Sequence, residues 1–297
     1  MNILITGGSG QVGRSLLELH WPETVHLHAP AREACDLADP ASLVACLDSR
    51  KWAGVINAGA YTGVDKAESE QAAAWAINAE APAQLARFCA AHKIPMIHIS
   101  TDYVFSGDGT RAWREDDPTA PLGVYGASKL AGEQAVLSAC PEAVVLRTAW
   151  VVSAFGHNFL KTMLRLAADR DQLRVVADQF GCPTSAHDLA AVIQTILVRQ
   201  LTQGDAPAGL FHAVNTGETH WAGLAGHIFA ASRSLGGPFC EVVEIPSKEY
   251  PTPAKRPANS QLDCTKLVDH YGVRLRPWPQ AVSEIVSRLV DGKEVVS

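Results

Sequence analysis

The chain has 297 residues, 47% of them hydrophobic and 19% charged, which is typical of a globular protein and unlike a disordered one. A formal net charge of -6 offers no basic surface to a phosphate backbone, so we expect no nucleic-acid partner. The amino terminus lacks a basic and apolar leader, and no uncharged apolar run is long enough to span a bilayer. We therefore expect no membrane partner and a cytoplasmic location.

Seven cysteines are scattered along the chain, and no two of them form a C-x-x-C pair. This odd number of isolated thiols favours a reducing compartment over a disulfide framework or a zinc knuckle. The 11 histidines also lack metal-ligand spacing. We predict no metal ligands in this sequence.

Short apolar runs alternate with longer segments of helical periodicity through the first half of the chain. The runs predicted as buried strands cover residues 2–5, 24–27, 54–57, 96–100 and 143–147. The segments predicted as helices cover residues 11–20, 40–50, 65–92 and 125–139. Strands that alternate with helices indicate right-handed βαβ units. We predict an α/β fold with a Rossmann-type doubly wound parallel sheet.

The second half of the chain is less regular. Helices are predicted over residues 158–168 and 186–199, and a strand over residues 210–214. Proline and glycine become frequent after Gly217, which indicates a loop-rich region packed on the sheet. The predicted division is a dinucleotide-binding domain over residues 1–150, to which 185–215 return, and a smaller C-terminal substrate-binding region over 151–184 and 216–297.

Three spaced glycines follow the first predicted strand: Gly7, Gly10 and Gly13. Gly7 would make the tight turn, Gly10 would let the backbone approach a pyrophosphate, and Gly13 would let the next helix pack closely. The helix N-terminus adds free N–H groups and the positive end of a dipole. We predict a dinucleotide site that includes Gln11 and Val12, with a purely structural turn as the alternative.

The end of the second predicted strand bears on the choice of cofactor. It has no acidic residue directly at the strand end, and Arg32 lies just beyond it. This favours the 2′-phosphate of NADPH, although the neighbouring Glu33 keeps NADH open. We expect Asp36 and Leu37 beside the adenine; a helix cap before Pro40 is the alternative for Asp36.

A catalytic set is predicted at the ends of later strands. The fourth strand runs into Thr101, and Tyr125 and Lys129 share one face of the next helix. A lysine ammonium beside a phenol lowers its pKa. Tyr125 would then donate a proton to a carbonyl oxygen as hydride reaches the carbon, with Thr101 bonded to the same oxygen. The alternative is an exposed helix start without chemistry.

Small residues after the third strand would let the cofactor lie against the backbone: Ala58, Gly59, Ala60 and Thr62.

Together these motifs resemble the extended short-chain dehydrogenase/reductase family, most closely its dTDP-4-dehydrorhamnose reductase branch. The matching segments are residues 7–13, 64–68, 100–105, 121–133, 147–150, 158–159, 178–184 and 256–260. The resemblance implies NAD(P)H-dependent reduction of the 4-keto group of a dTDP-sugar, dTDP-4-dehydro-β-L-rhamnose, in the synthesis of cell-surface polysaccharides such as lipopolysaccharide. It gives Thr101, Tyr125 and Lys129 as the catalytic set, with Lys129 also holding the nicotinamide ribose. The substrate contacts that it implies are Thr101, Asp102, Tyr125, Trp150, Asn158 and Arg256.

The chain departs from the family in lacking the acid often found near the end of the second strand. Some relatives bind magnesium through glutamates at a dimer interface. Magnesium and a homodimer stay open here, but those glutamate positions have no match in this chain, with Ser15 at one candidate position, so no residue is assigned to the metal.

Two other functions stay open at the level of sequence. One is a nucleotide-sugar 4-epimerase of the same family, and the other is a non-catalytic NADP-binding regulatory subunit. A dehydratase is disfavoured, because Tyr103 follows Thr101 and Asp102 where an Asp-Glu pair would be expected. Residues 178–184 are expected to support the substrate site.

Overall fold

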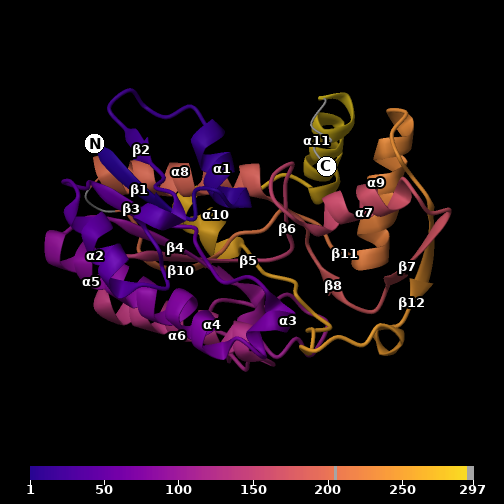
Figure 1. Cartoon of the computed structure of the whole chain (residues 1–297), viewed down its shortest axis with the longest axis horizontal. Coiled ribbons are helices and arrows are strands. Elements are labelled where there is room, and N and C mark those ends of the chain that lie inside the picture. The colour runs from indigo at the N-terminus through magenta and orange to yellow at the C-terminus, as the bar shows by residue number, and fades with distance from the viewer. Residues whose placement is uncertain (204–205, 293–297) are drawn as a thin grey trace.

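The computed structural model describes residues 1–203 and 206–292. Residues 204–205, in the segment predicted to return to the dinucleotide-binding domain, lie outside the described part, as do residues 293–297 of the predicted C-terminal region. Figure 1 shows a sheet with helices on both faces and, beside it, a second body built from later elements of the chain.

Six parallel strands form the central sheet, in the order β10-β5-β4-β3-β1-β2. They are β1 (Asn2–Thr6), β2 (His26–His28), β3 (Gly54–Asn57), β4 (Met96–Thr101), β5 (Val144–Thr148) and β10 (Gly209–His212). The chain first moves outward from β1 to β2 and then returns to β3 on the other side of β1. The strand order therefore reverses between β1 and β3, and open α/β sheets bind ligands at the strand ends beside such a reversal. The predicted α/β fold with a doubly wound parallel sheet is confirmed.

Helices cover both faces of this sheet (Figure 1). One face packs against α1 (Gln11–Glu18), α8 (Ala186–Thr202) and α10 (Thr265–Tyr271), and the other against α2 (Pro40–Asp48), α5 (Ala81–His92) and α6 (Val124–Ala139). The alternation of strand side chains explains this double cover. Ile3 and Ile5 pack with the first set of helices, Leu4 packs with the second, and all three are fully buried.

The single helix predicted over residues 65–92 is wrong, because the structure divides it. Its pieces are α3 (Val64–Ala67), α4 (Gln71–Trp75), a π-helical turn η2 (Ala76–Glu80) and α5. Glu70 leaves the helical conformation at φ -108° and ψ 44°. The π turn precedes Pro82, which has no N–H for the usual i→i−4 bond, and the N–H of Ala81 instead reaches the carbonyl of Ala76.

The second strand is also shorter than predicted. The N–H of Val25 donates to the carbonyl of Pro22 at 2.8 Å, so a turn occupies the residues before β2. The short 3₁₀ turns are η1 (Arg32–Ala34), η3 (Asp102–Val104) and η4 (Ser247–Glu249).

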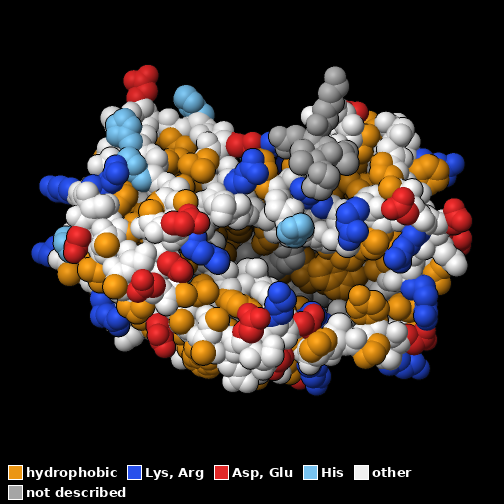
Figure 2. Space-filling model, viewed as in Figure 1, with side chains coloured by type: hydrophobic (Ala, Val, Ile, Leu, Met, Phe, Trp, Pro, Cys, Tyr) orange, Lys and Arg blue, Asp and Glu red, His pale blue; other side chains and the backbone are white. Residues whose placement is uncertain are grey.

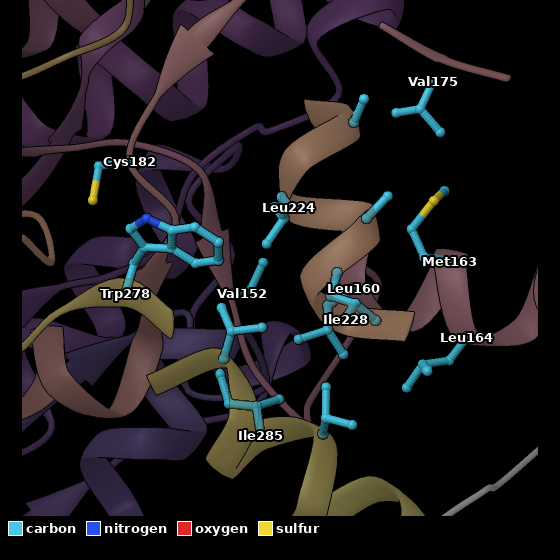
Figure 3. Packing of buried hydrophobic residues seen from close by; sticks show 14 of the residues in the cluster. Val152, Leu160, Met163, Leu164, Val175, Cys182, Leu224, Ile228, Trp278 and Ile285 are labelled. Atoms are coloured by element: carbon cyan, nitrogen blue, oxygen red, sulfur yellow. The ribbon is translucent and has the colours of Figure 1, made fainter. Parts of the chain in front are cut away.

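The second body has a hydrophobic core of its own. Its helices are α7 (Phe159–Ala167), α9 (Trp221–Ser234) and α11 (Trp278–Asp291). Its strands are β6 (Val151–Val152), β7 (Gln172–Val176), β8 (Phe180–Gly181), β9 (Thr184–Ser185), β11 (Thr219–His220) and β12 (Glu241–Ile245). Figure 3 shows Leu160 of α7, Ile228 of α9 and Ile285 of α11 pointing toward one another in this core. Neither α9 nor α11 was predicted from the sequence, because proline and glycine interrupt the pattern around them.

Between these elements the chain returns to the sheet, since α8 packs on α1 and β10 pairs with β5. None of the helices in the described ranges combines the length and the apolar character that a bilayer crossing needs.

Candidate active site

The glycine-rich turn after β1 lies directly against the turn after β3. Gly7 has a positive φ of 69°, and a β-carbon on it would lie 2.5 Å from the Cα of Gly59. A β-carbon on Gly13 would lie 2.3 Å from the carbonyl oxygen of Gly7, so α1 packs on the turn itself. Among the described residues, a β-carbon on Gly10 would have only that same oxygen within 4 Å beyond its own helix and chain neighbours, at 3.2 Å. The three glycines thus build a tight turn whose middle residue leaves space for a ligand.

The start of α1 fits a dinucleotide phosphate. Gly10 precedes the helix, and no side chain among the described residues caps it. The first N–H groups of the helix, including those of Gln11 and Val12, therefore remain available to an anion at the positive end of the helix dipole. The side chain of Gln11 points elsewhere, accepting from Ser153 and Asn158 at 2.9 Å each.

The loop after β2 carries the residues predicted near the adenosine. Arg32 is exposed in η1. Leu37 reaches the loop after β3, since a β-carbon on Gly59 would lie 2.5 Å from its Cδ1. Asp36 does not cap α2, so this alternative for it is wrong; Asp39 is the cap and accepts a backbone N–H at 2.9 Å.

Asn78, which the sequence analysis did not single out, holds the loop after β3. Its fully buried side chain accepts the N–H of Tyr61 at 2.8 Å and donates to the Tyr61 carbonyl at 3.1 Å. It also donates to the hydroxyl of Ser128 at 3.1 Å. Asn78 thereby fixes the loop that contains Ala58, Gly59, Ala60 and Thr62 against α6, next to Lys129. Its one sequence signal is Pro82, which indicates a distorted turn in a helical segment.

The structure brings Thr101, Tyr125 and Lys129 together at the C-terminal end of β4. Thr101 ends this strand, and its hydroxyl donates to the Asp102 carboxyl at 3.0 Å. Tyr125 and Lys129 lie in the first turns of α6, and Lys129 Nζ donates to the Ile99 carbonyl at 2.6 Å. The ring of Tyr125 meets that of Tyr103 edge-on, with centroids 5.5 Å apart.

Burial dominates the acid–base behaviour of this group. It raises the pKa of Tyr125 to about 12, with the Thr101 hydroxyl acting in the opposite direction. It lowers the pKa of Lys129 to about 8, which Glu133 partly opposes. The expectation that Lys129 depresses the pKa of Tyr125 is therefore wrong for this structure, because desolvation outweighs it and the ammonium is held by a carbonyl. The phenol carries its proton at neutral pH, as a proton donor must.

Asp102 is a second buried acid in the site, only 3% exposed. Burial raises the pKa of its carboxyl to about 6, while the hydroxyls of Ser260 and Thr101 act in the opposite direction. Its Oδ2 has no partner within hydrogen-bonding distance among the described residues, although the Ser260 hydroxyl is close enough to affect its pKa. One carboxyl oxygen is therefore left for a polar group that enters the site.

Trp150, at the end of β5, packs as part of an aromatic stack. Its ring lies 3.6 Å from that of Trp221, at an interplanar angle of 14°. A β-carbon on Gly181 would come within 2.8 Å of the indole. The backbone of Trp150 has a positive φ of 49°, which is rare for a bulky residue. Such strain persists only where the surroundings fix it, and it is common at functional sites.

Asn158 and Arg256 each have a partner within the protein. Asn158 caps α7 by accepting the N–H of Lys161 at 3.1 Å, and it donates to Gln11 of the glycine-rich turn at 2.9 Å. Arg256 donates to Asp65 at 2.7 Å. Its second terminal nitrogen is buried without a partner among the described residues. Arg256 thus keeps a donor for an anionic group.

The segment 178–184 supports the loop that carries Arg256. The N–H of Phe180 donates to the carbonyl of Ala258 at 2.8 Å, and the N–H of Ser260 donates back to Phe180 at 2.7 Å. Asp178 accepts the N–H of Ser247 at 2.9 Å.

Figure 2 shows the surface hollowed between the two bodies, with hydrophobic side chains gathered beside the hollow.

In the described ranges, no three His, Cys, Asp or Glu side chains lie close enough to hold a metal ion. All seven cysteines are free thiols, and five of them are buried. The residues that converge on the site are hydrogen-bond donors, a phenol, an amine and aromatic rings. This set suits an organic substrate and a nucleotide cofactor.

Known proteins match this chain over nearly its full length. Residues 1–290 match the family model described as RmlD substrate binding domain. A dTDP-4-dehydrorhamnose reductase of Sinorhizobium fredii is 42% identical over 99% of this chain and 100% of its own. A crystal structure of such a reductase from Clostridium acetobutylicum superposes with a TM-score of 0.90 at 34% identity, covering 97% of this chain and 99% of that chain. Another from Bacillus anthracis, in complex with NADP, has a TM-score of 0.88 at 31% identity, covering 96% and 98%.

Proposed function

The chain belongs to the RmlD substrate binding domain family, and from that premise we propose that it reduces the 4-keto group of dTDP-4-dehydro-β-L-rhamnose to give dTDP-L-rhamnose. The observation that carries the proposal is the protonated Tyr125 phenol, held at the C-terminal end of β4 beside Thr101 and one helical turn from Lys129. Relatives that share this chain's length carry the same activity in their names.

The glycine-rich turn fits a nicotinamide dinucleotide, and we propose NADPH as the preferred form. A β-carbon on Gly7 or Gly13 would fill the turn, and the first N–H groups of α1 remain available for phosphate oxygens. Arg32 is exposed just beyond β2, where a 2′-phosphate would lie. The NADP complex of a relative with the same fold supports this choice.

When bound, NADPH would supply a hydride to the carbonyl carbon of the sugar. The residues of the protein then handle the oxygen of that carbonyl. Tyr125 gives its proton to the oxygen, so that one O–H bond breaks, another forms, and the charge stays on the phenolate. Lys129 donates one N–H to the Ile99 carbonyl, and its other N–H groups would hold the nicotinamide ribose. Thr101 donates to the same oxygen once it turns from Asp102.

The raised pKa of Tyr125 suits this direction of reaction. A phenol with a pKa of about 12 stays protonated until negative charge develops on the substrate. The alkoxide that forms is a stronger base than a phenolate, so the proton moves downhill. Tyr125 is therefore primed to protonate the substrate, whereas the oxidation direction would need a base.

The remaining site residues are proposed to bind the nucleotide-sugar. Trp150, which is stacked on Trp221, would pack beside the sugar ring, and Asp102 offers a carboxyl oxygen to a sugar hydroxyl. Arg256 has a guanidinium nitrogen for the diphosphate. Asn158 joins the second body to the glycine-rich turn through Gln11. We therefore propose that it aligns the nucleotide-sugar with the cofactor.

The test is to follow oxidation of NADPH and NADH by absorbance with dTDP-4-dehydro-L-rhamnose, for the wild type and for Tyr125→Phe. Turnover by the wild type that is largely lost in the variant would support both substrate and proton donor. A folded protein that binds NADPH but oxidises neither nucleotide would contradict the proposal. Interconversion of a sugar without net oxidation would favour the 4-epimerase, and cofactor binding alone would favour the regulatory subunit.

A further inference from the structure

The first turn of α6 carries Tyr125, yet the residue that precedes the helix has no side chain with which to cap it. This residue is Gly123, in an extended conformation with φ -155° and ψ 178°. Helix starts leave backbone N–H groups without intrahelical acceptors, and an uncapped start frays. Another part of the chain must therefore hold this turn if the phenol is to stay in place.

Glu68 supplies that acceptor from a distant part of the sequence. Its Oε1 accepts the N–H of Val124 at 2.9 Å across 56 residues. A β-carbon on Gly123 would lie 2.5 Å from this same oxygen, and among the described residues beyond its own helix and chain neighbours only Glu68 comes within 4 Å of it. Glycine at position 123 is thus the residue that admits the carboxylate.

A backbone contact also holds this turn. A β-carbon on Gly126 would lie 2.2 Å from the carbonyl oxygen of Tyr103. The turn that contains Tyr125 is therefore in contact with both Glu68 and the backbone of Tyr103. The carboxylate also lies at the positive end of the helix dipole, where a negative charge is stabilising.

We propose that Glu68 is a positioning residue for the proton donor: it caps α6 from outside and fixes the turn on which Tyr125 lies. This inference rests on the proposed reduction, in which Tyr125 donates the proton. The hydrogen bond from α6 to Glu68 comes from the backbone of Val124 and not from the phenol of Tyr125. Loss of the cap lets the first turn of α6 shift, and a misplacement of about 1 Å costs on the order of 100-fold in rate.

The test is a double-mutant cycle of Glu68→Ala and Gly123→Ala, with Glu68→Gln as the conservative variant. Glu68→Ala should lower kcat by about 10- to 100-fold, while the Kd for NADPH stays within about 2-fold, because the glycine-rich turn is untouched. Glu68→Gln keeps an acceptor oxygen and should recover most of kcat. Gly123→Ala should reproduce the loss in the wild-type background and add nothing to Glu68→Ala, since the close contact of its methyl group is with that carboxylate.

The matched control is Glu70→Ala. Glu70 is an exposed glutamate two residues after Glu68. It accepts a hydrogen bond from the Tyr61 hydroxyl and not from an N–H of α6, so its replacement should leave kcat unchanged. Additive losses in the cycle, or a Glu68→Gln variant as slow as Glu68→Ala, would overturn the proposal. If Glu68→Ala changes the Kd for NADPH as much as it changes kcat, Glu68 has a general structural role and the proposal is overturned.

A direct readout separates this inference from the proposed function. The phenol of Tyr125 can be titrated by ultraviolet absorbance, with each variant compared with its Tyr125→Phe counterpart. Release of the turn admits water, so Glu68→Ala should move the pKa of Tyr125 from about 12 toward its solution value. A wild type without turnover would overturn the proposed reduction alone, and an unchanged Tyr125 titration would overturn the role of Glu68 alone.

Discussion

The indole of Trp150 lies flat against that of Trp221, with ring centroids 3.6 Å apart. Trp150 follows β5 of the central sheet, and Trp221 is the first residue of α9 in the second body. The stack therefore joins the two bodies beside the proposed catalytic group. Large aromatic side chains such as these contribute strongly to packing because of the apolar area that they bury.

Replacement of Trp221 by alanine should loosen this junction. We expect a loss of about 3 kcal/mol in the free energy of unfolding and a raised KM for the sugar, because Trp150 loses its support. The Kd for NADPH should stay unchanged. Trp75→Ala removes an exposed tryptophan and serves as control. A KM equal to that of the wild type would show that the stack does not shape the substrate site.

Gly7→Ala should destroy the cofactor turn. The variant has to place a methyl group 2.5 Å from the Cα of Gly59 in addition to adopting a positive φ. Gly109 has a similar φ of 77° but nothing within 4 Å of a β-carbon, so Gly109→Ala measures the conformational strain alone, about 1–2 kcal/mol. Thermal unfolding with and without NADPH separates the two effects. Stabilisation of Gly7→Ala by NADPH to the wild-type extent would contradict the proposed cradle.

The buried Asp102 predicts a particular dependence of stability on pH. Its pKa is about 6 in the folded protein and about 3.9 in the unfolded chain. The native state binds more protons between these values, so this group's contribution is complete below about pH 4 and is lost as the pH rises through 6. The difference amounts to about 3 kcal/mol.

Asp102→Asn should remove that dependence. Urea unfolding at pH 4 and pH 7 should show that the variant gains stability relative to the wild type by about 3 kcal/mol at the higher pH. The exposed Asp108 provides a matched control, Asp108→Asn, for which no such gain is expected. If the free energy of unfolding varies with pH in the same way for Asp102→Asn and the wild type, ionisation of the Asp102 carboxyl does not destabilise the folded protein.

Asn78→Ala should weaken both the fold and cofactor binding. The variant loses three hydrogen bonds and leaves the backbone of Tyr61 unpaired, so we expect a loss of about 2–3 kcal/mol in the free energy of unfolding. The Kd for NADPH should rise because the loop after β3 is no longer fixed to α6. Gln84→Ala, which removes a hydrogen bond at the surface, is the control. If the Kd of Asn78→Ala for NADPH equals that of the wild type, the loop after β3 does not contribute to cofactor binding.

The features that the sequence predicted well are local ones. They are the glycine-rich turn, the strands and the i,i+4 pair of Tyr125 and Lys129, and within each of them the residues are close in sequence. Asn78 and Glu68 were not recognised, because their partners Ser128 and Val124 lie 50 and 56 residues away. A pattern of spacings contains no information about contacts of that kind.

The acid–base prediction failed for a related reason. The i,i+4 spacing correctly placed Lys129 on the same helix face as Tyr125, but it could not give the depth of burial. Desolvation is the largest influence on both groups: it raises the pKa of Tyr125 and lowers the pKa of Lys129. The positive φ of Trp150 was equally hidden, since tertiary contacts and not the residue type impose it.

The late arrival of β10 has a consequence for synthesis of the chain. β5 ends at Thr148, but its outer neighbour begins only at Gly209. A ribosome must therefore translate the intervening residues while the edge of β5 stays open to other strands. Unpaired parallel edges are prone to aggregation during folding. Nascent chains that stop before residue 209 should depend on chaperones, and release of the full chain should relieve that dependence.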